Sequence, residues 1–138
     1  MMNVVSRLTL TLFPHVLAVC RLDPDVAPPP WASAGPFTSI TRTPGELSIV
    51  CLQEGVPEGV RCERGWRYLE VEGPLAFALT GILASLTGAL AVAGVSVFAI
   101  STFDTDYLLV RDADAERALE LLSREGHRVL KYGVDSKE

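Results

Sequence analysis

The longest hydrophobic stretch of the chain, residues 73–100, contains no charged residue. Gly94 divides it, because glycine commonly follows the last turn of a helix. Before that glycine, apolar residues recur at helical spacing on one side: Ile82, Leu83, Leu86, Leu90 and Ala93. Residues 95–100 instead form a short β-favouring run. The pattern predicts a buried helix over about residues 80–93 and a strand after it. A membrane span is the alternative, but such a helix is too short to cross a bilayer.

Shorter patterns predict the remaining elements. Strands are expected over residues 8–13, 16–22, 37–42, 47–52, 66–72, 107–111 and 128–132. A second helix should follow Asp112 as its cap, and its apolar face comprises Ala115, Ala118, Leu119 and Leu122. Residues 53–65 are expected to be a polar linker. The prolines of residues 24–30 exclude regular structure up to Trp31, which we expect to fill a groove beneath this loop.

The two halves of the sequence share a pattern 60 positions apart. Without a gap, residues 40–50 align with residues 100–110, so that an isoleucine, a hydroxyl residue, an acid and a valine recur in register. We interpret this as a repeat of a strand, a crossover and a hairpin, with chance similarity as the alternative. Only the second half keeps its crossover helix, because the proline-rich segment replaces it in the first half.

Composition narrows the class of protein. The 138 residues are 49% hydrophobic and 21% charged, which suits one compact domain or two small ones sharing a core. A formal net charge of −5 and the lack of Lys and Arg clusters argue against a nucleic-acid partner. Arg7 before an apolar run imitates a signal peptide, but Pro14 and His15 interrupt that run. We therefore expect a cytoplasmic protein.

The chain has three cysteines, Cys20, Cys51 and Cys62. They are odd in number and lack the spacing of metal ligands, so free thiols in a reducing compartment are the favoured interpretation. Cys62 lies between Arg61 and Arg64 in the sequence, and nearby positive charge favours a thiolate, so a reactive cysteine is the alternative. His15 and His127 have no partnered nucleophile motif. His127 follows a predicted helix, where we expect a surface contact with the helix dipole.

Two motifs resemble a known family. Residues 79–84, followed by Ala93-Gly94-Val95-Ser96-Val97, are similar to the signature of ACT domains, in which a glycine-led helix precedes a turn into the second strand. Residues 100–110, and residues 41–50 in the first half, resemble the bacterial tandem-ACT proteins related to the CASTOR arginine sensors. The resemblance covers about residues 8–130.

This resemblance implies a fold and a division into domains. The expected class is α+β, with two tandem ferredoxin-like ACT units (βαββαβ), antiparallel sheets and helices on one face of each sheet. Residues 1–60 are assigned to a degenerate N-terminal unit that lacks a full crossover helix. Residues 61–138 are assigned to a complete C-terminal unit.

One end of the predicted second sheet carries groups that suit a zwitterion. The first backbone N–H groups of the helix at Thr80 and Gly81 have no internal partner and attract a carboxylate. The turn at residues 101–106 brings one or two carboxylates, Asp104 and Asp106, that could hold an ammonium or a guanidinium, and Glu72 adds a third acid at the same end of the sheet. The candidate ligand-binding residues are Glu72, Thr80, Gly81, Ile82, Thr102, Phe103, Asp104 and Asp106.

Other interpretations of these residues stay open. Asp104 and Asp106 are equally typical of turns that bond their own backbone, and Thr80 is typical of a helix cap. An Asp-x-Asp metal site would need further oxygen ligands, and Glu72 is the only obvious candidate. We predict no metal, no cofactor and no catalytic residue.

The resemblance implies a non-catalytic regulatory or sensor protein that binds a small molecule, typically an amino acid, through interfaces between ACT units. The alternatives are a ligand-free dimerisation module and a small enzyme that uses the carboxylates of Glu72, Asp104 and Asp106. The outer face of the uncharged helix carries small residues, namely Ala84, Ser85, Thr87, Gly88 and Ala91. A solvated helix would carry charges there, so we expect the other half of the chain or a second copy, in a homodimer, to cover this face. No membrane partner is expected.

Overall fold

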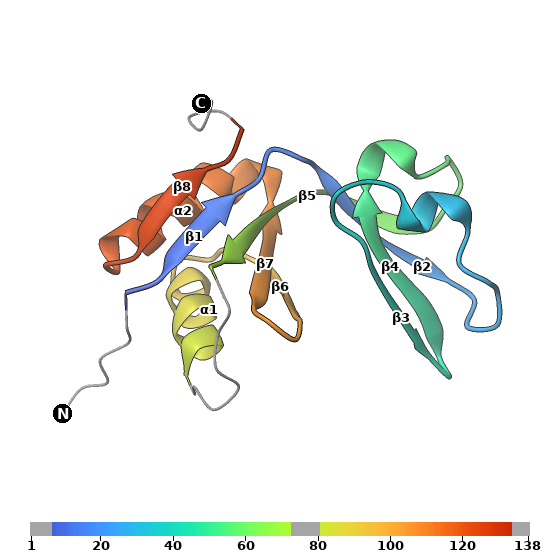
Figure 1. Cartoon of the computed structure of the whole chain (residues 1–138), viewed down its shortest axis with the longest axis horizontal. Coiled ribbons are helices and arrows are strands. Elements are labelled where there is room, and N and C mark those ends of the chain that lie inside the picture. The colour runs from blue at the N-terminus through green and yellow to red at the C-terminus, as the bar shows by residue number, and fades with distance from the viewer. Residues whose placement is uncertain (1–6, 73–80, 134–138) are drawn as a thin grey trace. The chain divides into compact units, whose positions relative to one another are not determined.

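The computed structural model describes residues 7–72 and 81–133, which fall into two compact units (Figure 1). Unit 1 combines residues 7–14 with residues 67–133, and unit 2 comprises residues 15–66. Strand β5 (Cys62–Val71) begins in unit 2 and ends in unit 1. Neither helix of the described residues is long and apolar enough to cross a membrane.

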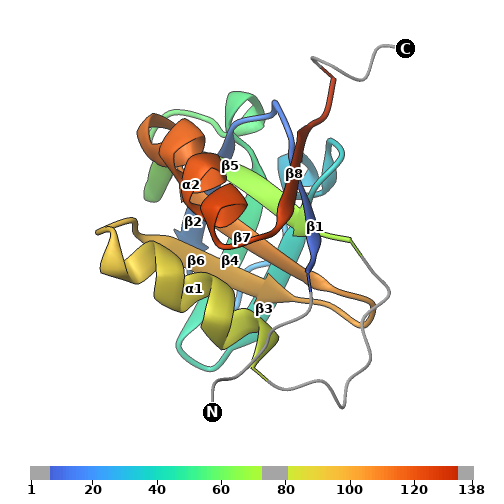
Figure 2. The ribbon, with the colours of Figure 1, turned by 90° about the vertical axis from the view of Figure 1, so that its left-hand side faces the viewer.

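Unit 1 is a five-stranded sheet with two helices on one face (Figure 2). Its elements are β1 (Thr9–Leu12), the end of β5, α1 (Ile82–Val92), β6 (Val97–Ser101), β7 (Asp106–Arg111), α2 (Ala115–Arg124) and β8 (Arg128–Lys131). The strands lie in the order β6-β7-β5-β1-β8. Strand β1 is antiparallel to β5 and parallel to β8, and its Leu10 lies opposite Val71 on one side and Val129 on the other.

The core of unit 1 lies between the sheet and the helices. Leu10 and Leu12 of β1 are at most 1% exposed, because alternate residues of a strand point to the same face. The predicted apolar face of α1 is confirmed: Leu86 and Leu90 are fully buried, and Ile82, Leu83 and Ala93 pack against the same core. The predicted face of α2, comprising Ala115, Ala118, Leu119 and Leu122, joins it too. One continuous core therefore orients both helices.

Strand β1 adds a fifth strand to the expected ferredoxin-like arrangement. A β-α-β-β-α-β unit has four strands, and here β1 lies between the first strand, β5, and the last, β8. Local alternation predicts β1 as a strand, but its pairing partners are distant in sequence. Contacts thus place this strand in unit 1, while the assignment of residues 1–60 and 61–138 to two domains stays a prediction.

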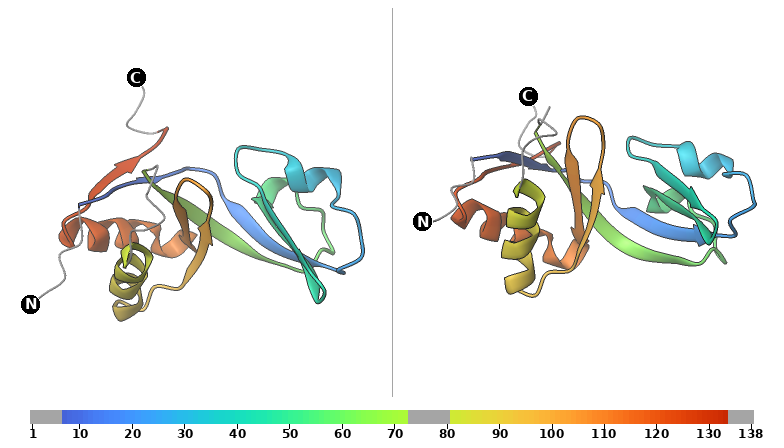
Figure 3. Two further views of the ribbon diagram at one scale, coloured as in Figure 1. Left: turned by 60° about the horizontal axis from the view of Figure 1, so that its bottom comes forward. Right: turned by 90° about the horizontal axis from the view of Figure 1, so that it is seen from below.

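Unit 2 is an antiparallel sheet without an α-helix in residues 15–66 (Figure 3). Strands β2 (Leu17–Leu22), β3 (Ser39–Thr43), β4 (Glu46–Leu52) and the start of β5 lie in the order β3-β4-β2-β5. A 3-10 turn, η1 (Pro30–Ser33), covers one face, where Trp31 and the buried Ala32 pack on the core. The prediction that the proline-rich segment replaces a crossover helix is confirmed.

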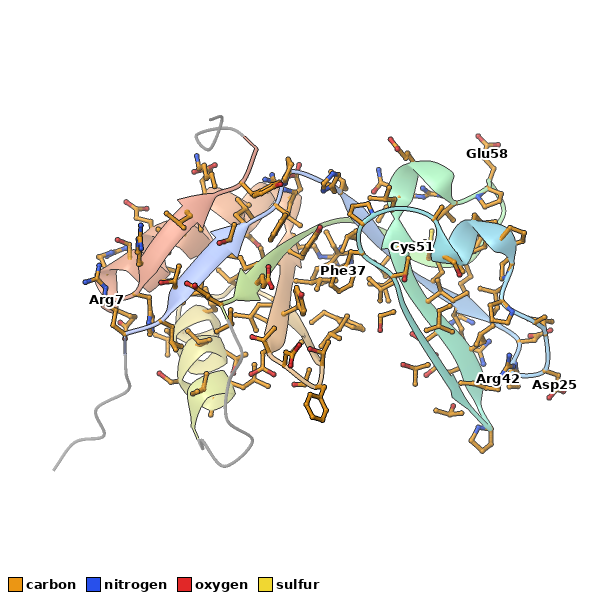
Figure 4. All side chains as sticks on the ribbon, in the orientation of Figure 1. Arg7, Asp25, Phe37, Arg42, Cys51 and Glu58 are labelled. Atoms are coloured by element: carbon orange, nitrogen blue, oxygen red, sulfur yellow. The ribbon has the colours of Figure 1, made fainter. Side chains whose placement is uncertain are left out.

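The loop that carries the prolines is also held by an arginine. The guanidinium of Arg42, at the end of β3, donates hydrogen bonds to the carbonyl oxygens of Pro24 and Val26, the latter at 2.9 Å. Figure 4 shows Arg42 beside this loop, near Asp25. Arg42 thereby attaches this loop to β3 at two points.

Two predicted boundaries are wrong. Strand β5 begins at Cys62 rather than Trp66, because the polar residues Glu63 and Arg64 lie on an exposed part of a paired strand rather than in a linker. Asp112 does not cap α2: it lies in a 3-10 turn, Asp112–Asp114, and its Oδ1 accepts a hydrogen bond from Arg67 Nη1 at 3.1 Å. The carboxylate of Asp112 binds the distant Arg67 instead of the backbone N–H groups at the start of the helix.

Both predicted hairpins are confirmed, but their alignment is off by one residue. Thr43 Oγ1 accepts the N–H of Glu46 at 3.2 Å, and Thr102 Oγ1 likewise accepts the N–H of Thr105 at 3.2 Å. The structural counterpart of Thr43 is therefore Thr102 and not Phe103. Adjacent aliphatic residues on β4 and on β7 let the sequences match in a register that is shifted by one residue and exchanges the two faces.

Candidate functional site

The turn between β6 and β7 is fastened by its own side chains. The N–H of Thr102 donates to the carbonyl oxygen of Thr105 at 2.8 Å, and Ser101 Oγ donates to Asp106 Oδ1 at 2.6 Å. Asp106 thus has a structural partner within the hairpin, although this partner is the side chain of Ser101 and not the backbone that the turn interpretation expected. Phe103, which is 80% exposed, and the exposed Asp104 form the tip. Of the two predicted aspartates, Asp104 is the more available to a ligand.

Thr105 attaches this turn to the end of β5, a role that the sequence did not suggest. It is only 6% exposed, and its hydroxyl donates to the carbonyl oxygen of Val71. The next residue, Glu72, donates its N–H to Thr9 at 2.8 Å and keeps an exposed side chain. The β6–β7 turn and the carboxylate of Glu72 therefore belong to the same end of the sheet, as predicted.

Among the described residues, no side chain caps the start of α1. Gly81 precedes the helix with φ +81° and ψ −5°, and its carbonyl oxygen accepts the N–H of Ser85 at 2.8 Å. This left-handed conformation favours glycine, and a Cβ at Gly81 would meet no atom of the described residues within 4 Å. Thr80 lies outside the described residues. The side chain of Ile82 packs against the core, so only the backbone N–H of Ile82 is available to a ligand at this helix end.

The start of α1 and the β6–β7 turn lie at the same end of unit 1 (Figures 2 and 3). The first three or four N–H groups of any α-helix lack partners within the helix, and the helix dipole adds partial positive charge there. At the same end lie the exposed carboxylates of Asp104 and Glu72. The arrangement offers donors for an anion and acceptors for a cation, which is what an amino-acid zwitterion requires.

Tyr107, which lies near Asp104, and its partner Glu70 are two further polar residues that the sequence prediction did not include. Tyr107 donates its hydroxyl hydrogen to Glu70 Oε2 at 3.3 Å. Burial, then the carboxylate of Glu70 and, more weakly, that of Asp104, raise the pKa of Tyr107, so the phenol stays neutral. Burial chiefly raises the pKa of the neighbouring Tyr68 to about 12. No motif marks this pair, because it joins strands 37 residues apart.

His127 is buried rather than at the surface, so that prediction is wrong. It is 7% exposed, and its Nδ1 accepts the backbone N–H of Leu8 at 3.1 Å. Burial lowers the pKa of His127, which keeps the ring neutral and able to accept. The residue secures the start of β1 and is not part of the candidate site.

Metal binding has no geometric basis in the described part of the chain. In residues 7–72 and 81–133, no three side chains of His, Cys, Asp or Glu are grouped so that they could hold a metal ion. Asp104, Asp106 and Glu72 are therefore not grouped closely enough to form the Asp-x-Asp metal site that was the alternative.

Comparison with known proteins identifies the family. The sequence model described as "ACT domain" matches residues 61–124, and a second model, for an N-terminal domain, matches residues 16–59. The crystal structure of protein Atu0741 from Agrobacterium tumefaciens is 42% identical, with a TM-score of 0.87 over 92% of this chain and 95% of that one. This chain is an ACT-domain protein. The predicted α+β class with ferredoxin-like ACT units is confirmed.

The ACT-domain protein is also related to the CASTOR arginine sensors. The "Cytosolic arginine sensor for mTORC1 subunit 1" of Bos taurus is 33% identical over 100 residues, or 64% of this chain. That match spans only 30% of the bovine protein's length. The regulatory subunit of aspartate kinase from Thermus thermophilus has a TM-score of 0.54 over 88% of this chain and 98% of that one. At 15% identity, this second likeness shows the shared fold alone.

Proposed function

We propose that this ACT-domain protein is a non-catalytic cytoplasmic sensor that binds a free amino acid between the start of α1 and the β6–β7 turn. The observation that carries the proposal is the helix start at Gly81, which no side chain of the described residues caps, with exposed carboxylates at the same end of the sheet. The resemblance to a protein named as a cytosolic arginine sensor supports the ligand class and the compartment.

The roles of the site residues follow from their chemistry. The backbone N–H groups of Gly81 and Ile82 would donate to the α-carboxylate of the ligand, as helix starts commonly do for anions. Asp104 and Glu72 would accept from the ammonium or from a cationic side chain. Thr80, Thr102, Phe103 and Asp106 would complete the site, with Asp106 acting mainly through its bond to Ser101.

Isothermal titration calorimetry against each of the twenty amino acids tests this proposal. We expect saturable heat with at least one of them, and a loss of about tenfold or more in affinity for Asp104→Asn, since a charged hydrogen bond contributes about 1.5–3 kcal/mol. The matched control is Glu58→Gln, an exposed acid in unit 2 (Figure 4), which should bind as the wild type does. Absence of heat with every amino acid at millimolar concentration would refute the sensor function.

Self-association is a second candidate function, favoured by the outer face of α1. The helix has no charged residue, and Val92 is 92% exposed beside the exposed Ala84, Gly88 and Ala91. We propose that a second copy of the chain covers this face, as a homodimer formed by contacts between ACT units. Small residues permit close approach of another backbone, and burial of Val92 would contribute about 1.5–3 kcal/mol per subunit.

Sedimentation equilibrium separates the two functions. The wild type should be a dimer, and Val92→Glu should shift it to the monomer, because the new carboxylate would be buried without a partner. A charge of the same kind at an exposed site on α2, Ser123→Glu, should leave the dimer intact. A monomeric wild type at high micromolar concentration would contradict this proposal and leave the amino-acid site untouched.

A further inference from the structure

The three cysteines of the chain converge in unit 2. Cys20 lies on β2, Cys51 on β4 and Cys62 at the start of β5. Cys20 and Cys51 are at most 2% exposed and belong to one core, against which the partly exposed Cys62 packs. The thiol of Cys20 interacts with both others. Figure 4 marks Cys51 on its strand. The described residues hold no metal-binding group of three side chains.

The strand register places Cys20 and Cys62 directly opposite each other. The N–H of Arg21 donates to the carbonyl oxygen of Arg61 at 2.9 Å, so these neighbours form a hydrogen-bonded pair. In an antiparallel ladder the two kinds of pair alternate, and Cys20 and Cys62 therefore form a non-hydrogen-bonded pair. The Cα atoms of such a pair are about 4.5 Å apart, and its side chains are the closest in the sheet. A disulfide bond spans Cα atoms about 4.4–6.8 Å apart.

Cys51 is less well placed for this chemistry. Its partner across the β2–β4 ladder is Ala18, two residues from Cys20, so Cys20 and Cys51 are diagonal neighbours. Diagonal pairs are about 7–8 Å apart, beyond the usual span of a disulfide. The register therefore favours a Cys20–Cys62 bond over a Cys20–Cys51 bond.

We propose that Cys62 and Cys20 are a peroxide-reactive dithiol that closes reversibly to a disulfide between β5 and β2. Cys62 reacts first because it alone among the three is partly exposed. Its thiolate attacks one oxygen of hydrogen peroxide, the O–O bond breaks, and a sulfenic acid forms while hydroxide leaves and takes up a proton as water. The sulfur of Cys20 then attacks the sulfenic sulfur, and the S–O bond breaks. The departing hydroxide takes the thiol proton of Cys20, so two thiols and one peroxide give one disulfide and two waters.

The pKa of the Cys20 thiol agrees with its proposed role as the second thiol to react. Burial, and then the neighbouring thiols of Cys51 and Cys62, raise the pKa of Cys20 to about 12. Burial also raises the pKa of Cys51. Both remain protonated at neutral pH, and a protonated thiol is a poor nucleophile toward peroxide. Cys20 is thus suited to resolve a sulfenic acid held against it rather than to capture peroxide from solvent.

Peptide mapping after peroxide treatment tests the pairing directly. Trypsin separates the cysteines, since cleavage after arginine leaves Cys20 in residues 8–21, Cys51 in residues 43–61 and Cys62 in residues 62–64. Treatment with hydrogen peroxide should lower the mass of the wild-type protein by about 2 Da, and subsequent alkylation should then modify one thiol instead of three. Residues 8–21 should be found linked to residues 62–64, and dithiothreitol should restore all three thiols.

Two variants sharpen this experiment. Cys51→Ala should form the same linkage as the wild type, whereas Cys62→Ser should lose it. The proposal is overturned if the wild type keeps three thiols, links Cys51 or a second molecule, or gains about 32 Da as a sulfinic acid on Cys62 without a disulfide. The wild-type map decides the matter even where a variant does not fold.

Discussion

Replacing Leu90 by alanine tests how α1 is oriented in unit 1. Leu90 is fully buried among the residues of the unit 1 core, close to the last turn of α1. Truncation to alanine removes three carbon atoms and leaves a cavity that the surrounding side chains fill only in part. Measured losses for such substitutions are about 2–5 kcal/mol, a large part of the 5–15 kcal/mol that stabilises a typical domain.

Val92 provides the matched control on the same helix. It lies two residues further along, on the opposite face, and is 92% exposed. Val92→Ala removes little buried area and replaces a β-branched residue by the best helix former. The free energy of unfolding of this variant should differ from that of the wild type by less than about 0.5 kcal/mol.

Urea unfolding followed by far-UV circular dichroism measures both effects. The m-value should be similar in all three proteins, so that the midpoints report stability. Runs at two protein concentrations separate folding from association, because a dimer unfolds at a midpoint that rises with concentration. Equal losses in Leu90→Ala and Val92→Ala at low concentration, or a loss below about 1 kcal/mol in Leu90→Ala, would refute the assigned helix face.

Three further predictions concern single residues. Burial lowers the pKa of His127 below its ordinary 6.5, so the unfolded chain takes up a proton at higher pH than the folded chain. The free energy of unfolding should therefore fall as the pH drops below about 6.5. Urea titrations of His127→Gln at several pH values should lack this part of the pH dependence. Thr105→Val should lose about 1–3 kcal/mol in the same assay, because a buried carbonyl loses its hydroxyl donor; an unchanged midpoint would contradict the bond. Gly81→Ala should destabilise the protein by about 1–2 kcal/mol, because Gly81 has a left-handed backbone conformation. Gly88→Ala, inside α1, should stabilise it by about 0.5–1 kcal/mol. In thermal unfolding, the melting temperature should fall for Gly81→Ala and rise for Gly88→Ala.

Local patterns sufficed to predict the elements and their buried faces. The spacing of Leu86 and Leu90 fixes the face of α1, and alternation fixes that of β1, because burial repeats with the period of the backbone. Which strands pair with one another cannot be predicted from such local patterns. Nothing in the sequence near Leu10 indicates that β1 lies between β5 and β8, since that choice depends on which distant strands leave a matching edge. The one-residue error in the hairpin alignment has the same origin.

The candidate site was predictable where it depends on backbone conformation and not where it depends on distant contacts. Gly81 and the exposed Asp104 follow from helix and turn signals in the sequence. Thr105 does not, because a threonine in a polar turn gives no sign that its hydroxyl reaches another strand. Tyr107 and Glu70 were missed for the same reason, and the burial of His127 reflects a contact with a strand more than 100 residues away.

The two proposed functions use different surfaces of one helix, which makes them separable. The ligand site lies at the start of α1, where Ile82 turns its side chain to the core and leaves only backbone groups available. The proposed dimer contact lies along the outer face and reaches Val92 at the other end, about 15 Å away along an 11-residue helix. Asp104→Asn should therefore reduce amino-acid binding without changing the association state, and Val92→Glu should do the reverse. If Val92→Glu also weakened binding, the site would have to be shared across the dimer, and assembly would then be the route by which the ligand regulates a partner.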